Sequence, residues 1–286
     1  IGTETLGSIV SPSTRTGASG LRPTFGRVSR YGAMALSWTM DKIGPICRSA
    51  EDTALVFAAI HGADGLDPTA RTVPFHYDGG RPLSELRVGY LKAGFERQPE
   101  GEDEADRERS RQAIRLDNQA LEAVRSLGLD PVPVALPEDL PISALRLILT
   151  AEAAAAFDEL TRTGRDELLV AQEAWSWPNT FREARLIPAV EYIQANRIRT
   201  MLMGEMEKVM ADIDVFITPS YAGSVLLATN LTGHPTAVVP NGFIDGHPTS
   251  ISFVGGLWRD DAAIRLAAAY QSVTDFHSRV PERFAV

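Results

Sequence analysis

The sequence predicts an α/β fold in which a central mixed, largely parallel β-sheet is covered by α-helices on both sides. Strand-like and helix-like runs alternate along most of the 286 residues. The contiguous apolar run 215–217 is typical of a strand buried on both faces, as in parallel sheets. The alanine-rich run 142–160 follows an amphipathic helix and a short extended segment, which is the order expected of an α/β protein.

Residues 1–62 predict a loop-rich scaffold followed by a helix. Gly, Ser, Thr and Pro are dense up to Pro45, but Tyr31 and Trp38 argue against a solvated linker. The run from Ser49 to Asp52 resembles a capping box, so we expect a helix from there to about Gly62.

The middle of the chain predicts mostly helices around one strand and one edge segment. The acidic run 100–108 is interpreted as a solvated loop and first helical turn, because metal ligands must converge and not merely be dense. We expect a strand at 86–91, a helix over 113–127, a proline-rich edge segment at 131–137 and a helix over 142–160.

The last third predicts a return to strands. Its first helix carries an apolar stripe from Ile198 to Ile213, which we assign to the core. We then expect a buried strand at 214–219, a loop or short helix at 221–230, strands at 236–240 and 249–254 joined by a turn at Asp245-Gly246, and a closing helix over 263–273.

Composition excludes several classes of function. The net charge of -9 argues against a nucleic-acid partner, because such partners select basic surfaces. No run is long and apolar enough to cross a bilayer, so we expect no membrane partner. The one cysteine, Cys47, rules out an intrachain disulfide and a cysteine-rich metal site, and it favours a reducing compartment. We therefore expect a cytoplasmic protein.

Ser8 is the candidate nucleophile. It lies in the small, turn-prone run 2–13, which can crowd backbone N–H groups around a serine hydroxyl. An acyl-transfer serine needs an exposed Oγ and amide donors where the carbonyl oxygen becomes negative, and Gly7 suits that geometry.

Three blocks resemble the amidase signature family. Residues 2–13 (GTETLGSIVSPS) resemble its serine segment, residues 20–29 (GLRPTFGRVS) its G-L-K/R-P-T-x-G-R-V-S block, and residues 40–45 (MDKIGP) its L-D-x-x-G-P block. Weaker similarity continues at 214–219 and 230–235, so the resemblance covers essentially the whole chain.

The resemblance implies a Ser-cisSer-Lys triad in an amidase-signature-type fold. Ser8 is then the nucleophile, and the backbone N–H groups of Thr5, Leu6, Gly7 and Ser8 form the oxyanion hole. The family's lysine base and bridging serine lie upstream of the serine segment. We therefore expect the 286 residues to be the C-terminal portion of a longer enzyme, a single amidase signature domain truncated at its N-terminus.

Within that domain, residues 1–62 are expected to form the nucleophile-bearing core segment. Residues 63–212 form the variable, helix-rich half that shapes the substrate funnel, and residues 213–286 the C-terminal strands and helix of the core.

The lysines of the chain are not expected to replace the missing base. A base lysine must be neutral, which requires burial or a cationic neighbour. Nothing in the sequence around Lys92 or Lys208 provides either condition, and Lys42 is expected to be solvated.

Three residues depart from the family's serine segment. Glu4 replaces an aspartate, Leu6 a glycine and Val10 an arginine. Leu6 is expected to be poorly suited to a positive φ or to narrow the pocket beside the carbonyl. These departures, together with the unplaced base, keep open a non-catalytic binding or scaffold protein.

Trp175, Trp177 and Phe181 form an aromatic cluster in the variable half. Core packing is the default interpretation, and lining of a substrate pocket is the alternative. If they line the pocket, the substrate is apolar or aromatic.

The sequence thus predicts an amidase that acts on a small-molecule linear amide, or on a related carbamate or ester, without metal or organic cofactor. An amidotransferase A-type subunit that delivers ammonia to a partner is the alternative, although no acidic residue lies between Pro219 and Asn230 to read a glutamine amine. A Ser-His-Asp triad using His234 or His247 is the mechanistic rival. A homodimer is left open.

Overall fold

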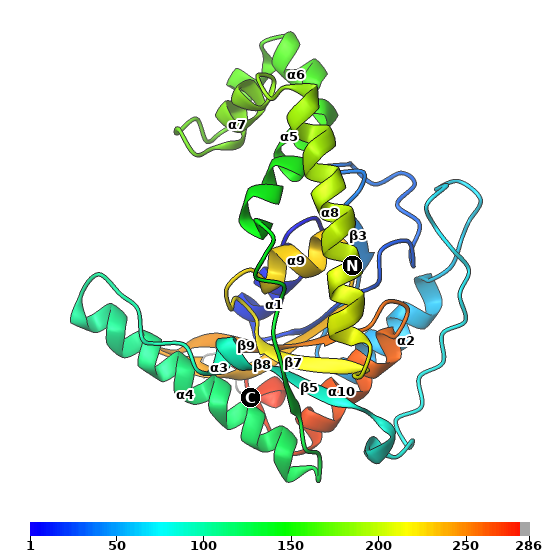
Figure 1. Cartoon of the computed structure of the whole chain (residues 1–286), viewed down its shortest axis with the longest axis vertical. Helices are drawn as coiled ribbons and strands as arrows, with labels where there is room; N and C mark the ends of the chain where they lie inside the picture. The colour runs from blue at the N-terminus through cyan, green and yellow to red at the C-terminus, as the bar shows by residue number, and fades with distance from the viewer. Residues whose placement is uncertain (281–286) are drawn as a thin grey trace.

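A seven-stranded mixed sheet forms the centre of the fold (Figure 1). The structure is a computed structural model that describes residues 1–280, so the last six residues of the predicted C-terminal segment lie outside it. The strand order is β4-β2-β8-β9-β7-β5-β6, and β1 and β3 form a separate two-stranded ladder. The strands are β1 (Gly2–Glu4), β2 (Ser19–Arg22), β3 (Lys42–Gly44), β4 (Ile46–Cys47), β5 (Val88–Leu91), β6 (Val132–Val134), β7 (Val215–Pro219), β8 (Thr236–Ile244) and β9 (His247–Gly255).

The mixed sheet is confirmed, but the expectation that it is largely parallel is wrong for the strands described. β5 runs parallel to β6 and β7, whereas the other four neighbouring pairs are antiparallel. The turn at Asp245-Gly246 explains part of this, because both residues have positive φ, 51° and 76°, and reverse the chain between β8 and β9. The apolar run in β7 reports burial on both faces, which does not depend on the direction of neighbouring strands.

Helices cover both faces of the sheet, as predicted. On one face Phe57 of α2, Val124 of α4 and Leu266 of α10 join a core cluster with Val215 and other strand residues. On the other face Phe216 packs in a separate cluster, so successive residues of β7 point into different cores. The helices are α1 (Val10–Thr16), α2 (Ala50–Ile60), α3 (Lys92–Phe95), α4 (Glu104–Ser126), α5 (Arg146–Ala156), α6 (Asp158–Arg162), α7 (Trp177–Ala184), α8 (Ala189–Met210), α9 (Val225–Thr232) and α10 (Asp260–Ser272).

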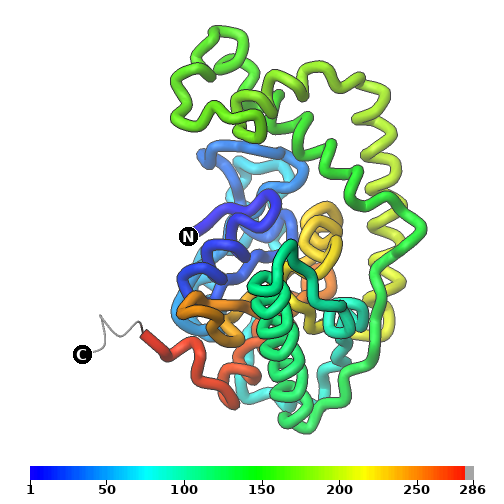
Figure 2. The backbone as a smooth tube through the Cα atoms, turned by 90° about the vertical axis from the view of Figure 1, so that its left-hand side faces the viewer, coloured from blue at the N-terminus to red at the C-terminus, as the bar shows by residue number. Residues whose placement is uncertain are grey.

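Helices α5 to α8 form an arm that projects from the sheet (Figures 1 and 2). A core cluster that includes Ile148 of α5, Leu202 of α8 and Leu231 of α9 fastens the arm to the rest of the molecule. The single helix expected over 142–160 is interrupted: α5 ends before Phe157, which has φ -107° and ψ 22°. The Phe157 ring stacks on Phe181 of α7, with centroids 4.9 Å apart, and this packing favours the break.

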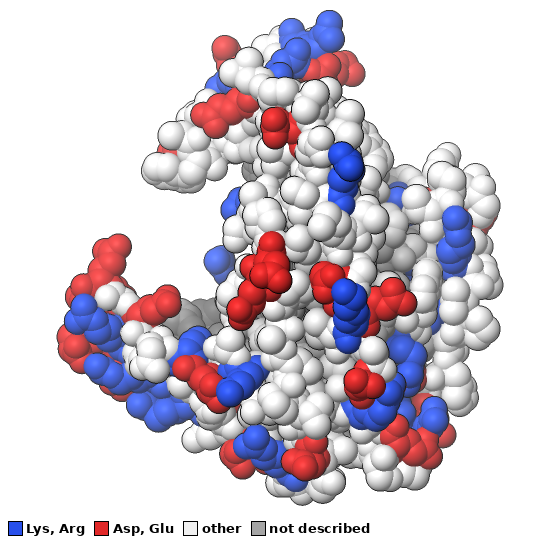
Figure 3. Space-filling model, viewed as in Figure 1, with Lys and Arg blue, Asp and Glu red and all other residues white. Residues whose placement is uncertain are grey.

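Basic and acidic side chains are interspersed on the face of the molecule shown in Figure 3. On α4, for example, Arg111 lies 2.8 Å from Glu104 and 3.0 Å from Glu108. Within residues 1–280, no helix is long and apolar enough to span a membrane.

Candidate active site

Ser8 lies exposed in the turn that leads into α1. Gly7 precedes it with a φ of 87°, in the left-handed region that favours glycine. A Cβ at Gly7 would also lie 3.0 Å from Cδ2 of Leu226, so both conformation and space require glycine here. The turn therefore presents the Ser8 hydroxyl outward while the residues on either side are buried.

Glu4 braces this turn from within the protein. Its Oε2 accepts hydrogen bonds from the N–H groups of Ile9, at 2.8 Å, and Val10, at 3.0 Å. Its Oε1 accepts from Arg22 and from Asn230, each at 2.8 Å. Burial alone would raise the pKa of Glu4, but the charge and hydrogen bond of Arg22 outweigh it and lower that pKa to about 2.

The turn at Ser8 contains backbone N–H groups that make no hydrogen bond to the described part of the chain. Within residues 1–280, the N–H groups of Leu6, Gly7 and Ser8 have no acceptor in the protein. Leu6 does not take a positive φ, contrary to one expectation, because Gly7 carries that conformation, and its side chain packs against the arm's core cluster. The Thr5 hydroxyl donates to Asp41 at 2.5 Å, which ties the end of β1 to the segment before β3.

Ser8 opens into a cavity of about 630 Å³. Thr5, Asp41 and Lys42 line it near the serine, whereas most of the remaining wall is apolar. The apolar lining comes from three separate parts of the chain and includes Tyr31, Met34, Trp38, Phe157, Trp177 and Phe181.

Two of the three aromatic residues singled out in the sequence therefore share a cavity with Ser8. Trp177 and Phe181 lie on α7, with ring centroids 5.5 Å apart. Trp175 does not line this cavity, and its side chain is 84 % exposed.

Lys42 corrects an expectation, because it is buried and not solvated. In the β1–β3 ladder it lies opposite Glu4, and its ammonium group donates to the carbonyl of Met40. Burial, followed by the nearby charge of Arg22, holds the pKa of Lys42 well below its ordinary value. The other two lysines agree with expectation: both are exposed, Lys92 near Glu96 at the end of α3 and Lys208 near Glu205 of α8.

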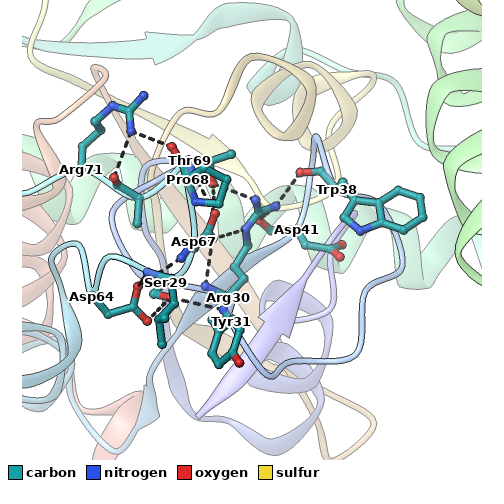
Figure 4. Close-up of polar contacts among 12 residues, drawn as sticks. Ser29, Arg30, Tyr31, Trp38, Asp41, Asp64, Asp67, Pro68, Thr69 and Arg71 are labelled. Atoms are coloured by element: carbon teal, nitrogen blue, oxygen red, sulfur yellow. Dashed lines mark hydrogen bonds and ion pairs between the residues drawn. The ribbon is translucent and has the colours of Figure 1, made fainter.

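Arg30 holds one wall of the cavity in place (Figure 4). Its Nε and backbone N–H both donate to Asp67, at 3.0 Å, and one amino group donates to the carbonyl of Trp38 at 2.5 Å. The other amino group donates to the hydroxyl of Thr69 at 2.7 Å. Because these bonds occupy much of the guanidinium, Arg30 acts as a brace and not as a free cation.

The histidines proposed for a rival triad lie elsewhere. His234 is buried, bonds the Thr232 hydroxyl through Nδ1, and has a pKa lowered to about 4 by burial and by Arg22. His247 begins β9, next to the hairpin turn. No histidine of the described chain lines the Ser8 cavity. In the same residues, no three His, Cys, Asp or Glu side chains are placed to hold a metal ion.

Sequence reasoning missed Trp38, Phe157 and Lys42 as cavity residues. Trp38 and Phe157 reach the cavity from segments more than 100 positions apart, a convergence that no local pattern reports. For Lys42 the adjacent Asp41 suggested a solvated segment, and only the pairing of β1 with β3 shows the burial.

Comparisons with known proteins identify the family of this chain. The family model described as amidase matches residues 1–227. The A-type subunit of the glutamyl-tRNA(Gln) amidotransferase from Roseiflexus castenholzii is 32 % identical, over 99 % of this chain and 64 % of its own length. The chain thus spans about two thirds of the length of the curated relatives it matches.

Solved structures share the fold. A native peptide amidase from Stenotrophomonas maltophilia has a TM-score of 0.75 and 27 % identity, over 95 % of this chain and 61 % of its own. The corresponding amidotransferase subunit from Thermotoga maritima has a TM-score of 0.75 at 23 % identity, over 95 % of this chain and 61 % of its own. The family model, the motifs and the fold agree, and the chain belongs to the amidase signature family.

Proposed function

We propose that the full-length protein hydrolyses a carboxylic amide, or a related carbamate or ester, through an acyl-enzyme on Ser8. The observation that carries the proposal is the exposed Ser8 hydroxyl, which opens into a mostly apolar cavity beside the unpaired N–H groups of Leu6 and Gly7. Preorganised backbone N–H donors beside a nucleophile stabilise the oxyanion that forms during acyl transfer.

In the proposed reaction, Ser8 Oγ attacks the amide carbon and its proton passes to a base. The carbonyl oxygen becomes an anion that accepts hydrogen bonds from the N–H groups of Thr5, Leu6, Gly7 and Ser8. The C–N bond then breaks, the nitrogen takes the proton, and ammonia or an amine leaves. Water attacks the ester on Ser8, which releases the carboxylic acid and restores the hydroxyl.

The base and the bridging serine are proposed to lie in sequence that precedes Ile1. The family pattern places both there, and the chain's 64 % coverage of a relative is consistent with this arrangement. Together with that segment, residues 1–286 would form a single amidase signature domain. Lys42 is the second candidate for the base, because this residue lines the same cavity and is buried.

The substrate is proposed to carry an apolar or aromatic group. Trp177 and Phe181 place two aromatic rings in the cavity of Ser8, and Phe157 adds a third. Such a wall favours hydrophobic contact over recognition of a charged substrate. Because Cys47 is a free cysteine, we propose that the protein is located in a reducing compartment such as the cytoplasm.

The second candidate is an amidotransferase A-type subunit that passes ammonia to a partner. It is favoured by the relatives, which include the amidotransferase subunit of Roseiflexus castenholzii. The apolar cavity and the lack of an acidic residue between Pro219 and Asn230 favour the hydrolase. Native mass spectrometry of the full-length protein would separate a partner complex from a monomer or homodimer.

The first test is labelling of the full-length protein with a fluorophosphonate, in which Ser8 Oγ forms a bond to phosphorus and fluoride leaves. We expect one adduct by intact mass spectrometry, and its loss in Ser8→Ala. Amide turnover should fall by roughly 10⁶-fold in that variant, as for other nucleophile deletions. An adduct that persists in Ser8→Ala would refute the assignment.

The same assay distinguishes the two candidate bases. If the base precedes Ile1, Lys42→Met should retain most of the labelling rate. If Lys42 is the base, labelling should be lost as fully as in Ser8→Ala. Full-length protein that takes up no label and hydrolyses no amide would instead favour the binding or scaffold protein.

A further inference from the structure

Trp38 lies between two residues that the helical arm holds by buried polar groups. Glu152 of α5 accepts hydrogen bonds from the Ser37 hydroxyl at 2.5 Å, from the Thr39 N–H at 3.0 Å and from the Thr39 hydroxyl at 2.7 Å. Glu152 is only 5 % exposed. One carboxyl group of the arm therefore fixes both neighbours of Trp38.

Arg199 of α8 approaches the same segment from the other helix of the arm. Its amino groups donate to the Thr39 hydroxyl at 2.6 Å and to the Thr39 carbonyl at 2.7 Å, and its Nε donates to the Leu231 carbonyl at 2.6 Å. The Thr39 hydroxyl thus accepts from Arg199 and donates to Glu152. The two buried charged groups meet through a residue of the loop and not in a direct ion pair.

The opposite side of this segment is held as well. Arg30 donates to the Trp38 carbonyl, and the indole extends away from the guanidinium (Figure 4). Asp41 accepts from the N–H groups of Leu36, at 2.8 Å, and Ser37, at 3.0 Å. Residues 36–41 contain no helix or strand, and these side-chain bonds add to two backbone bonds, from the N–H groups of Met40 and Asp41 to the Ser37 carbonyl, in holding the segment.

This arrangement costs folding free energy that would not be needed if its role were only to attach the arm. Burying a carboxyl and a guanidinium group opposes folding, and apolar side chains would join two helices to a loop at less cost. What hydrogen bonds add is direction, because they fix the backbone on both sides of one side chain. That side chain, Trp38, is half exposed and lines the Ser8 cavity.

We propose that Glu152 is a positioning residue that sets Trp38 as a wall of the Ser8 cavity and so gives the enzyme its preference for amides with an aryl group. The preference rests on the proposed hydrolase function, whereas the placement of Trp38 can be tested without it. An indole whose orientation is already fixed in the free protein loses little conformational entropy when an aryl group binds. This lower entropic cost strengthens binding.

The test is a calorimetric titration of the full-length protein with 4-phenyl-2-butanone, a phenyl-substituted ketone that has the carbon skeleton of a phenylpropanamide but no C–N bond to hydrolyse. The variants are Glu152→Gln, Trp38→Ala and the double variant. We expect each single variant to raise the Kd about tenfold, and the double variant to bind no more weakly than Trp38→Ala alone. Glu191→Gln, an exposed acid of α8, is the matched control and should leave the Kd unchanged.

Kinetics give the second measurement. With 3-phenylpropanamide, Glu152→Gln should raise KM about tenfold with little change in kcat, while propanamide kinetics stay as in the wild type. If Glu152→Gln fails to fold, Ser37→Ala replaces it. This variant keeps the buried Glu152 and Arg199, removes only the hydrogen bond from the Ser37 hydroxyl to Glu152, and should also raise the Kd.

Two results would overturn the proposal. One is a wild-type Kd in both Glu152→Gln and Ser37→Ala. The other is a double variant whose losses simply add, because Glu152 would then act on binding by a route other than Trp38. The titration needs no turnover. If the protein hydrolyses no amide, the hydrolase assignment is refuted, but the binding data still decide whether Glu152 positions Trp38.

Discussion

Glu4 shows at the residue scale why a departure from a family pattern need not weaken a site. The longer side chain, with glutamate in place of the family's aspartate, reaches two N–H groups of the Ser8 turn and the guanidinium of Arg22 together. Both charged side chains are fully buried. Arg22 in turn bonds Thr236 of β8, so the Ser8 turn is connected to the central sheet through the Glu4–Arg22 ion pair.

Glu4→Gln is expected to destabilise the protein by about 3–5 kcal/mol, because it leaves the buried charge of Arg22 without its partner. The folded-state pKa of Glu4 is lower than its unfolded value near 4.5, so the ionised group stabilises the fold above that pH. This stability should be lost as pH falls from about 4.5 towards 2. Urea unfolding of both proteins at pH 7, 5 and 3 measures it.

The control for that experiment is the wild-type protein in the same buffers, since other carboxylates also titrate there. The difference in unfolding free energy between the two proteins should shrink towards low pH. A difference that stays constant from pH 7 to pH 3 would show that the Glu4 charge contributes nothing to stability.

At the scale of one element, α2 follows local rules visible in the sequence. The Ser49 side chain accepts from the N–H of Asp52 at 3.1 Å, and Asp52 accepts from the N–H of Ser49 at 3.2 Å, which completes the predicted capping box. The helix then buries Phe57 against the sheet on the face away from α1. Its role is structural and separate from the cavity.

Ser49→Ala should therefore cost about 1 kcal/mol of stability, because a backbone donor of α2 loses its acceptor. Amide hydrolysis at a temperature well below the melting point should not change. Thermal unfolding and kcat/KM of the two proteins check this expectation. In the double variant Ser49→Ala/Asp52→Ala, the loss of stability should be smaller than the sum of the losses in the two single variants. A fall in kcat/KM in Ser49→Ala would instead indicate that α2 affects the site.

At the scale of the whole molecule, the cavity exists because the arm lies over the Ser8 turn. Ser8 and Asp41 come from the N-terminal segment, whereas Phe157, Trp177 and Phe181 come from the arm. The arm is fastened through its own core cluster, which includes Leu202 of α8. The N-terminal segment therefore supplies the part of the cavity wall around Ser8, and the arm supplies aromatic side chains of the apolar wall.

Trp177→Ala should raise the KM for 3-phenylpropanamide by roughly tenfold, because an aromatic wall of the cavity is lost. Trp175→Ala removes the same chemical group from an exposed site two positions away and is the matched control. Steady-state kinetics of the full-length variants give the answer. Equal effects of the two substitutions would mean that α7 acts through the folding of the arm and not through the cavity.

Local patterns predicted several of the elements and the turn-prone run around Ser8, whereas the helix expected over 142–160 is interrupted at Phe157. The capping box of α2, the hairpin turn at Asp245-Gly246 and the edge position of β6 each depend on residues adjacent in sequence. The turn around Ser8 depends on Gly7 in the same way. These features were predictable because the interactions that specify them are short-range.

Strand directions, the burial of Lys42 and the cavity were decided by tertiary structure. The direction of β7 relative to β9 depends on chain connections, and the same apolar run suits either direction. Lys42 became buried because β1 pairs with β3 and sets it opposite Glu4. Trp38 and Trp177 share a wall only once the arm has packed. Neighbouring residues were enough to specify the chemistry of each segment, and long-range packing determined which of those groups meet.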